Sequence, residues 1–261
     1  MECGVVLVKF SIITASRNAA DELLRTAHSI ASQSYRNFEW IIVDGASTDG
    51  TSASIKNFFP EFLGNFLSEP DSGIYNALNK GISRISGDWV IFLGAGDELY
   101  ASDTLEVLSI ILSGVGAEKN LVYGVVHEVD GRNNIVLKVR DECWMGLDGP
   151  WVIGRPVLPC HQGVLHRARI FAEGFRFNER LKIASDNEVL LVEFIAGRGY
   201  KIDQVVAKYL RGGVSSTAAN RVRMIYECIV VNWRVGIFWK KPIYQIIVLL
   251  AAVIRPLVKR E

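Results

Sequence analysis

The 261-residue sequence has few cysteines, few prolines and almost no net charge. Its 29 basic and 28 acidic residues leave a formal net charge of +1, which gives no charge-based reason to expect nucleic-acid binding. The four cysteines are far apart and show no Cys-x-x-Cys spacing, so neither a disulfide framework nor a structural zinc site is expected. They are Cys3, Cys143, Cys160 and Cys228. This cysteine usage favours a reduced, cytoplasmic chain.

The sequence also lacks the glycine-rich motifs of two common nucleotide-binding folds. Neither Gly-x-Gly-x-x-Gly nor Gly-Lys-Ser/Thr occurs, which argues against a dinucleotide-binding domain and a P-loop domain. Residues 1–10 show no positively charged start followed by a long apolar stretch. We therefore expect a strand there and no secretory signal.

The apolar segment near the C-terminus, residues 242–254, is shorter than the roughly 20 residues that a membrane-spanning helix needs. Lys240, Lys241 and Arg255 bracket it. Basic flanks around an apolar core suit a helix that lies in a membrane interface beside anionic lipid. We therefore expect peripheral contact through residues 235–260 at the inner face of the cytoplasmic membrane. A buried terminal helix or an oligomer contact would give the same pattern.

At 261 residues the whole chain is long enough for one large α/β domain or two small ones. Strand and helix patterns alternate regularly in its first half. Short apolar runs predict strands, and apolar residues at three-and-four spacing predict helices. The alternation favours parallel βαβ units. Strands are expected at 9–14, 40–43 and 89–93, and helices after residue 18, from 51 and at 74–85.

The second half is less regular. An antiparallel pair is expected around a turn at 130–134, followed by a loop-rich stretch with several prolines and glycines. The pattern resumes with a helix from Asp186 to about 196, a strand at 200–210 and a helix from about 217. We interpret the chain as one α/β domain with a C-terminal helical extension.

Four aspartates sit just past strand-like runs or at helix starts: Asp44, Asp71, Asp97 and Asp186. In an open α/β sheet the carboxyl ends of the strands share the edge at which ligands bind. Repeated carboxylates at that edge suggest a site that holds a nucleotide or a metal ion and performs acid–base chemistry.

Four sequence blocks, in order, resemble the family 2 glycosyltransferases, nucleotide-sugar enzymes with the GT-A fold. They span 10–18, 41–51, 68–81 and 87–97, and the resemblance covers about residues 9–210. Two later blocks, 160–163 and 182–186, look like the branch found in bacterial exopolysaccharide and lipopolysaccharide gene sets.

The resemblance implies a GT-A fold, with a single Rossmann-like, mixed but mainly parallel sheet flanked by helices. It implies a glycosyltransferase domain at 1–215, with a nucleotide half at about 1–100 and an acceptor half at about 101–215, followed by an apolar helical extension at 216–261. The implied reaction is inverting transfer of a sugar from a nucleotide-sugar to a saccharide or lipid-linked acceptor in surface polysaccharide biosynthesis. UDP is favoured from family frequency alone.

The resemblance also assigns the nucleotide-binding residues. Asp44 would accept a hydrogen bond from a uracil or guanine ring N–H, because a fixed carboxylate is an acceptor. Asp71 would contact the base or ribose. The alternative for Asp44 and Asp49 is stabilisation of the turn at 45–50, where aspartate is favoured. The expected nucleotide set is Thr14, Ser16, Arg17, Asp44, Asp71 and Lys80, the last beside Asn79 on the helix after Asp71.

The expected metal site departs from the family pattern. The family usually carries Asp-x-Asp after the strand that ends near residue 93, whereas this chain has Gly94-Ala95-Gly96-Asp97. Asp97 alone would hold Mg²⁺ or Mn²⁺, because phosphate and water oxygens complete the shell of such an ion. Glu98, the next residue, is a candidate to assist Asp97, and the sequence does not fix the direction of its side chain. The alternative is a reaction without a metal ion.

On the acceptor side, the resemblance makes Asp186 the general base that deprotonates the attacking hydroxyl. A single base and an in-line attack imply inversion at the anomeric carbon. The alternative role for Asp186 is a helix cap. His161 and Gln162 would line the acceptor side, unless His161 is an ordinary structural histidine. Arg211 would neutralise diphosphate from a mobile loop at 211–215, unless this is a plain connection.

Two other functions compete with this reading. A catalytically decayed nucleotide-binding or scaffold protein is motivated by the depleted acidic motif at 94–97. A sugar nucleotidyltransferase shares nucleotide binding at the sheet edge, but its usual glycine-rich opening is absent after the first strand.

Overall fold

The computed structural model describes residues 7–131, 134–212 and 218–258. Nine strands of this part form one mixed sheet in the order β3-β2-β1-β4-β10-β6-β11-β5, with β7 paired to β6. The strands are β1 (Phe10–Ser16), β2 (Phe38–Asp44), β3 (Phe66–Ser68), β4 (Trp89–Phe92), β5 (Glu98–Leu99), β6 (Leu121–Val129), β7 (Val136–Arg140), β10 (Val164–Arg167) and β11 (Gly199–Leu210). A separate hairpin joins β8 (Trp151–Val152) to β9 (Arg155–Pro156).

The two halves of the sheet differ in strand direction. β3, β2, β1 and β4 run parallel to one another, as the alternation of strands and helices predicted. β10 is antiparallel to both β4 and β6, and β5 is antiparallel to β11, while β6 and β11 are parallel. The expected antiparallel pair around residues 130–134 is β6 and β7. Parallel pairing therefore dominates the first half only.

Helices cover both faces of the sheet. They are α1 (Ala20–Ala31), α2 (Thr51–Phe58), α3 (Ile74–Ile82), α4 (Thr104–Ser113), α5 (Arg169–Ala172), α6 (Asp186–Ile195), α7 (Ala218–Arg234) and α8 (Pro242–Val258), with 3₁₀ turns η1 (Pro60–Asn65), η2 (His161–Gly163) and η4 (Phe238–Lys240). Buried residues of α1, α2 and α4 pack in one core cluster, and those of α3 and α6 pack in a second. This α/β architecture agrees with the expected fold class.

The central strands are buried on both sides because helices lie on both faces. Along β2 both alternating sets of side chains are buried, Trp40 and Ile42 in the first cluster and Ile41 and Val43 in the second. This continuous apolar run is typical of a parallel strand covered on two faces.

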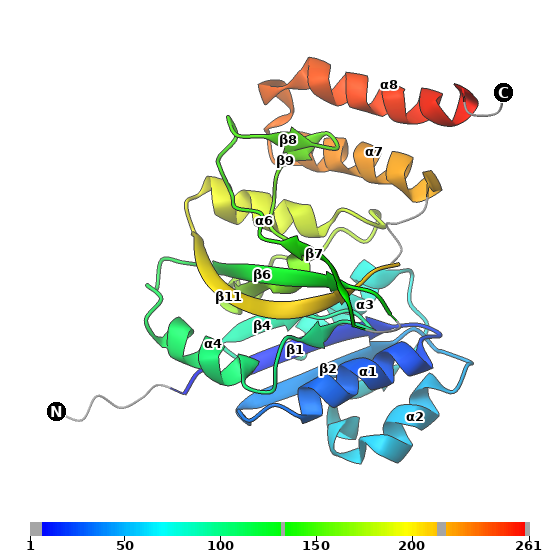
Figure 1. The fold of residues 1–261 in the computed structure, drawn as a ribbon, viewed down its shortest axis with the longest axis vertical. Helices are drawn as coiled ribbons and strands as arrows, with labels where there is room; N and C mark the ends of the chain where they lie inside the picture. Colours follow the sequence, from blue (N-terminus) through cyan, green and yellow to red (C-terminus); the bar gives the residue numbers. More distant parts are fainter. Residues whose placement is uncertain (1–6, 132–133, 213–217, 259–261) are drawn as a thin grey trace.

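The C-terminal helices stack on the α6 side of the sheet, with α7 over α6 and α8 outermost (Figure 1). Val231 of α7 and the following Ile237 are part of the second core cluster. The side chain of Asn232 donates to the Gly154 carbonyl (2.7 Å) and to Gln245 of α8 (2.8 Å). The extension is thus packed into the body of the protein, and the domain boundary at residue 215 stays a prediction.

The sequence interpretation missed several elements, among them α4 and β10. α4 buries Leu105, Leu108 and Leu112, and β10 lies within the second half, just after the stretch interpreted as loop-rich. β10 matters for function, because its antiparallel insertion between β4 and β6 brings η2 to the carboxyl end of β4.

Candidate functional site

The carboxyl ends of three parallel strands bring polar side chains together in register. Ser16 of β1 lies opposite Asp44 of β2, and Asp44 lies opposite Ser68 of β3. Ligands bind outside this edge in open α/β sheets. The polar residues Ser16, Asp44 and Ser68 therefore lie side by side at this edge, and nucleotide binding there stays a prediction.

Asp44 itself is fully buried and supports the turn that follows it. Its carboxylate accepts from the Ser47 backbone N–H (3.0 Å), from the Ser47 hydroxyl, and from the Ser68 hydroxyl (2.7 Å). Asp49 acts similarly, accepting from the Thr51 hydroxyl (2.5 Å) and the Ala20 N–H (3.1 Å). These bonds, the Thr51 hydroxyl first, lower the pKa of Asp49. Both aspartates thus stabilise the turn at 45–50, and base recognition by Asp44 stays a prediction.

Asp71 and Arg17 converge on Gly45, the residue after Asp44. A Cβ at Gly45 would overlap the Asp71 carboxylate and lie 3.3 Å from Arg17 Cδ, so glycine permits this close approach. Asp71 also accepts from the Gly73 N–H (2.9 Å), which fixes one of its oxygens. Next to them the buried Ser16 Oγ has no hydrogen-bond partner. An unpaired buried hydroxyl at this edge suits a ligand that can hydrogen-bond to it.

Two other predicted nucleotide residues have their polar atoms engaged elsewhere. The Thr14 hydroxyl accepts from the Trp40 indole N–H (2.9 Å) within the core. The Lys80 ammonium pairs with Glu69 (2.7 Å) and donates to the Pro70 carbonyl (2.8 Å). Lys80 thus braces the loop that carries Asp71.

The Asp97 carboxylate is buried and held by three donors. It accepts from the Gly94 N–H (3.2 Å), the Leu210 N–H (2.9 Å) and the Gln162 side chain. Burial raises the pKa of Asp97 to about 7, and these three bonds lower it in part. At neutral pH the carboxyl is therefore divided between its protonated and ionised forms.

The neighbouring Glu98 is committed elsewhere, since it forms ion pairs with Arg25 and with Lys208 (3.8 Å). In the described part of the chain no group of three or more His, Cys, Asp or Glu side chains is arranged to hold a metal ion. An ionised carboxylate has about four lone-pair sites, of which the donors around Asp97 use three. One lone-pair site of Asp97 thus remains for a divalent cation, which would take its other ligands from outside the protein.

Asp186 is the first residue of α6, and its carboxylate accepts a hydrogen bond from α3 and faces a histidine of η2. Asp186 Oδ1 accepts from the Tyr75 hydroxyl of α3 (3.0 Å). Burial, reinforced by the Asp186 charge, raises the pKa of Tyr75 well above its ordinary value, so this hydroxyl stays protonated and is the donor. On the other side, Asp186 Oδ2 lies 3.8 Å from His161 Nδ1.

The partly buried His161 and the fully buried His166 form a pair next to Asp186. Their Nε2 atoms are 3.2 Å apart, and burial lowers the pKa of each ring, so both are neutral near pH 7. His166 Nδ1 has no partner, which costs less if it is an acceptor than if it is an N–H. His166 Nε2–H then donates to His161, and His161 presents its Nδ1–H toward Asp186. His161 also stacks on Phe92 (5.3 Å between ring centroids).

Two consecutive residues of η2 therefore contact the two remaining carboxylates. His161 faces Asp186, and Gln162 bonds to Asp97. Cys160 Sγ lies 3.1 Å from Gln162 Oε1 and donates to it, so that the Gln162 amide group donates toward Asp97. The two residues predicted to line the acceptor side thus link the predicted metal ligand to the predicted base.

A second link joins the predicted donor side to the predicted acceptor side. Lys182, four residues before Asp186, donates from Nζ to the Ser72 carbonyl (2.7 Å), next to Asp71. Asn76 of α3 donates to Glu179 (2.9 Å). The segment from Asp71 to Asn76 consequently contacts both the nucleotide edge and the Asp186 segment.

Arg211 follows β11 and forms an ion pair with Glu128 (2.5 Å). The backbone N–H of the preceding residue, Leu210, donates to Asp97. The predicted loop therefore begins next to the predicted metal ligand. The rest of that loop, residues 213–215, lies outside the described residues.

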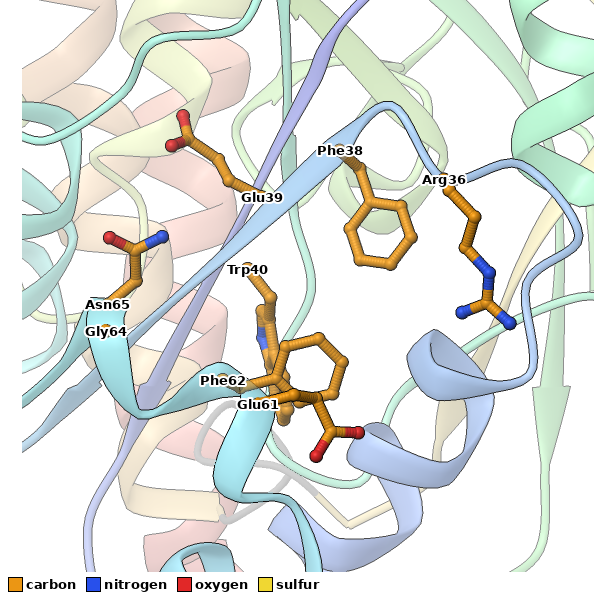
Figure 2. A pocket seen from close by; sticks show the side chains of 8 residues that line it. All are labelled: Arg36, Phe38, Glu39, Trp40, Glu61, Phe62, Gly64 and Asn65. Carbon is orange, nitrogen blue, oxygen red and sulfur yellow. The ribbon is translucent and has the colours of Figure 1, made fainter.

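A cavity of about 310 Å³ lies at the other end of β2 (Figure 2). Phe38, Trp40 and Phe62 line it, while the Glu39 carboxylate points away from these rings. None of the predicted site residues lines this cavity, and it lies at the amino end of β2, away from the edge where ligands bind.

The sequence interpretation missed two residues of this site, Tyr75 and His166. Tyr75 lies inside a block that carried the family resemblance, but its direction depends on how α3 packs. His166 lies on β10, which was not expected. A buried histidine pair gives no local sequence signal.

Comparison with known proteins gives a family and a fold. A model of "Glycosyl transferase family 2" matches residues 11–131. A "PGL/p-HBAD biosynthesis glycosyltransferase" of Mycobacterium bovis (strain BCG / Pasteur 1173P2) is 31% identical over 228 residues, which cover 81% of each chain.

Two solved structures have similar folds at low sequence identity. S. aureus TarS 1-349 in complex with UDP-GlcNAc gives a TM-score of 0.64 at 18% identity, over 85% of this chain and 66% of that one. The mannosyltransferase PcManGT from Pyrobaculum calidifontis in complex with GDP-Man and Mn²⁺ gives a TM-score of 0.64 at 16% identity, over 94% of this chain and 73% of that one.

The raised pKa of Asp97 predicts a pH dependence of stability. Between pH 3.8, the ordinary pKa, and about 7 the folded protein binds more protons at this carboxyl than the unfolded chain does. Its contribution to the free energy of unfolding therefore falls as pH rises through this window. We expect the melting temperature of the wild type to fall relative to Asp97→Asn from pH 5 to pH 8. The measurement is thermal unfolding of both proteins in excess chelator, and a constant or opposite difference would contradict the buried high-pKa state.

Proposed function

The chain belongs to glycosyl transferase family 2 and is a glycosyltransferase, and we propose that it transfers a sugar from a UDP-sugar to a saccharide or lipid-linked saccharide with inversion at the anomeric carbon. We place this reaction in surface polysaccharide biosynthesis. The observation that carries the proposal is the position of Asp186. Its carboxylate accepts a hydrogen bond from Tyr75 of α3, and Tyr75 follows closely after the segment that bears Asp71.

The donor nucleotide is proposed to lie at the ends of β1 and β2. Arg17, which is exposed, and Asp71, which is partly exposed, approach each other across Gly45. The unpaired Ser16 hydroxyl supports the same location. UDP is the proposed nucleotide, in keeping with the fold shared with the UDP-GlcNAc complex of TarS.

A divalent cation, Mg²⁺ or Mn²⁺, is proposed to accompany the diphosphate, with Asp97 as its protein ligand. Such a cation stabilises the charge of the leaving diphosphate. Gln162 and the backbone N–H groups of Gly94 and Leu210 orient the Asp97 carboxylate. Arg211, the residue after Leu210, is the proposed additional cation for the diphosphate once it leaves Glu128.

Asp186 is proposed to remove the proton from the acceptor hydroxyl. The Tyr75 hydroxyl donates to Oδ1 and the His161 ring faces Oδ2, and the Asp186 side chain is still 21% exposed. Because the His161 ring is neutral, it supports the orientation of the carboxylate without neutralising its negative charge. A single base on the acceptor side supports one in-line displacement and therefore inversion.

The acceptor is proposed to be presented at an anionic membrane surface that contacts α8. Apolar residues on the outer side of α8 are 47–73% exposed although they are large. They are Ile243, Ile246, Ile247, Leu250, Val253 and Ile254. None of the helices in the described residues is both long and apolar enough to cross a membrane.

Aromatic and basic side chains flank this apolar face. Trp233 and Trp239 are 62% and 70% exposed with ring centroids 5.8 Å apart, and Lys240 is exposed next to them. Tryptophan prefers the membrane–water interface, and lysine is attracted to anionic lipid. This combination supports a peripheral location at the cytoplasmic membrane face.

Asp186→Asn tests the base assignment. Loss of general-base catalysis costs about 10²- to 10⁴-fold in rate, and we expect a loss of that size in kcat with little change in UDP affinity. Glu188→Gln is the matched control. Glu188 is an acid in the same first turn of α6, but it pairs with Arg234. UDP release from the preferred UDP-sugar measures kcat. Full activity of folded Asp186→Asn would exclude this base, and UDP binding without turnover in the wild type would favour the decayed scaffold.

Thermal shifts test the donor and the metal. A ligand at about 100 times its Kd stabilises the folded state by about 2.7 kcal/mol, which corresponds to about 5–10 °C for a protein of this size. We expect such a rise with UDP-sugars and a smaller one with GDP- and dTDP-sugars. Chelator should reduce both the UDP shift and the turnover, and Mn²⁺ or Mg²⁺ should restore them. Full turnover in excess chelator would remove the cation from the reaction.

Vesicle sedimentation tests the membrane surface. Ile247→Glu places a charge in the exposed face of α8, and loss of one buried isoleucine costs about 1.5–3 kcal/mol, so we expect binding to anionic vesicles to fall about tenfold or more. Ile110→Glu is the control, since Ile110 is 68% exposed on α4. Equal loss in both variants, or equal binding to neutral vesicles, would contradict the proposal. A dimer in solution that dissociates in the Ile247→Glu variant would also contradict the proposal.

A further inference from the structure

Glu227 is a buried acid on α7, in the segment that the sequence interpretation treated as an extension. It is only 4% exposed, between the buried residues Ile225, Cys228 and Val231 of the same helix. A carboxylate at such a depth is costly unless it accepts several hydrogen bonds. Its partners therefore indicate why an acid is present there.

Both oxygens of Glu227 bind backbone N–H groups of the segment that leads into α6. The Lys182 N–H lies 2.9 Å and 3.0 Å from the two oxygens, and Oε2 also accepts from Ile183 (2.8 Å) and Ala184 (3.0 Å). Hydrogen bonds to a charged acceptor are stronger than neutral ones. One side chain of α7 thus fixes three consecutive peptide groups.

These peptide groups end two residues before Asp186. Ser185, which lies between them and Asp186, is fully buried and accepts from the Asn178 N–H through its hydroxyl (2.6 Å). Lys182 reaches forward to the Ser72 carbonyl on the donor side. The backbone before Asp186 has little freedom, and Glu227 supplies most of its hydrogen bonds to α7.

A further contact joins α7 to the start of α6, just after Asp186. Asn187 lies beside Cys228, with Asn187 Nδ2 at 3.6 Å from Cys228 Sγ. Neighbouring residues of α7, Glu227 and Cys228, therefore contact the residues just before and just after Asp186. The start of α6 is positioned against α7 as a unit.

We infer that Glu227 is a positioning residue for Asp186, so that α7 is part of the scaffold of the active site. The inference rests on the proposed role of Asp186 as the base. Its physical basis is that a displacement of about 1 Å in a reacting group can cost about 100-fold in rate. Three anchored peptide groups hold the Asp186 carboxylate at a fixed position relative to Tyr75 and His161.

Glu227→Gln tests this role, because glutamine keeps the size but offers only one acceptor oxygen to three N–H groups. We expect kcat for UDP release from the preferred UDP-sugar, with water as acceptor, to fall about 10- to 100-fold. The Kd for UDP should stay within about twofold, because Asp71, Arg17 and Ser16 are untouched. Such a split between kcat and nucleotide affinity would not follow from general loss of structure.

Glu193→Gln is the matched control. Glu193 is a similarly buried acid, 5% exposed, at the far end of α6, where it binds Asn120 and Arg198. We expect it to lower the melting temperature to a comparable extent while kcat changes less than about twofold at a temperature at which both variants are folded. An equal loss of kcat in both variants would assign the effect to α6 stability and overturn the inference.

The double variant Asp186→Asn/Glu227→Gln separates failure of the inference from failure of the proposed function. If Glu227 acts through Asp186, adding Glu227→Gln to Asp186→Asn changes the residual rate less than about twofold. A further 10-fold loss would overturn the inference and leave the base intact. If Asp186→Asn alone retains full kcat, the base assignment fails and the positioning role fails with it. Should Glu227→Gln not fold, Glu227→Asp keeps the charge with a shorter reach, and wild-type kcat in that variant would overturn the inference.

Discussion

The candidate site depends on one topological constraint, the antiparallel insertion of β10 between β4 and β6. Because β10 runs opposite to β4, the η2 turn before it lies at the carboxyl end of β4, where the chain continues to Asp97. η2 then extends one side chain to each of two carboxylates, Gln162 to Asp97 and His161 toward Asp186. Two adjacent residues of one partly buried turn thus lie at the proposed leaving-group side and at the proposed acceptor side.

The carboxylates that first looked equivalent have different physical roles. Asp44 is buried and satisfied by serine hydroxyls, so it shapes the turn beneath the nucleotide edge. The absence of a side chain at Gly45 lets Asp71 lie near Arg17, and the Gly73 N–H holds one Asp71 oxygen. Asp97 is buried with a raised pKa, and Asp186 is partly exposed between a protonated tyrosine and a neutral histidine. Environment rather than residue type distinguishes them.

The sequence was sufficient for the elements whose order is local and periodic. The parallel strands and the helices after them follow from apolar spacing, and the family blocks located Asp44, Asp71, Asp97 and Asp186. Strand alternation would also have placed Thr14 on the same buried face as Phe10 and Ile12. Contacts between distant segments were not accessible: the Lys80–Glu69 pair depends on a loop conformation, and β10 is too short to show periodicity. Tyr75, His166 and Glu227 act through packing across the sheet and between helices, which no local pattern records.

The stereochemistry of the first product tests the central claim most directly, because one base and one displacement allow only inversion. The measurement is ¹H NMR of the sugar released or transferred from an α-linked UDP-sugar, taken before mutarotation. A single in-line attack assisted by Asp186 predicts that the initial product is the β anomer. An initial α anomer would contradict the mechanism, since retention requires a different arrangement of groups around the anomeric carbon.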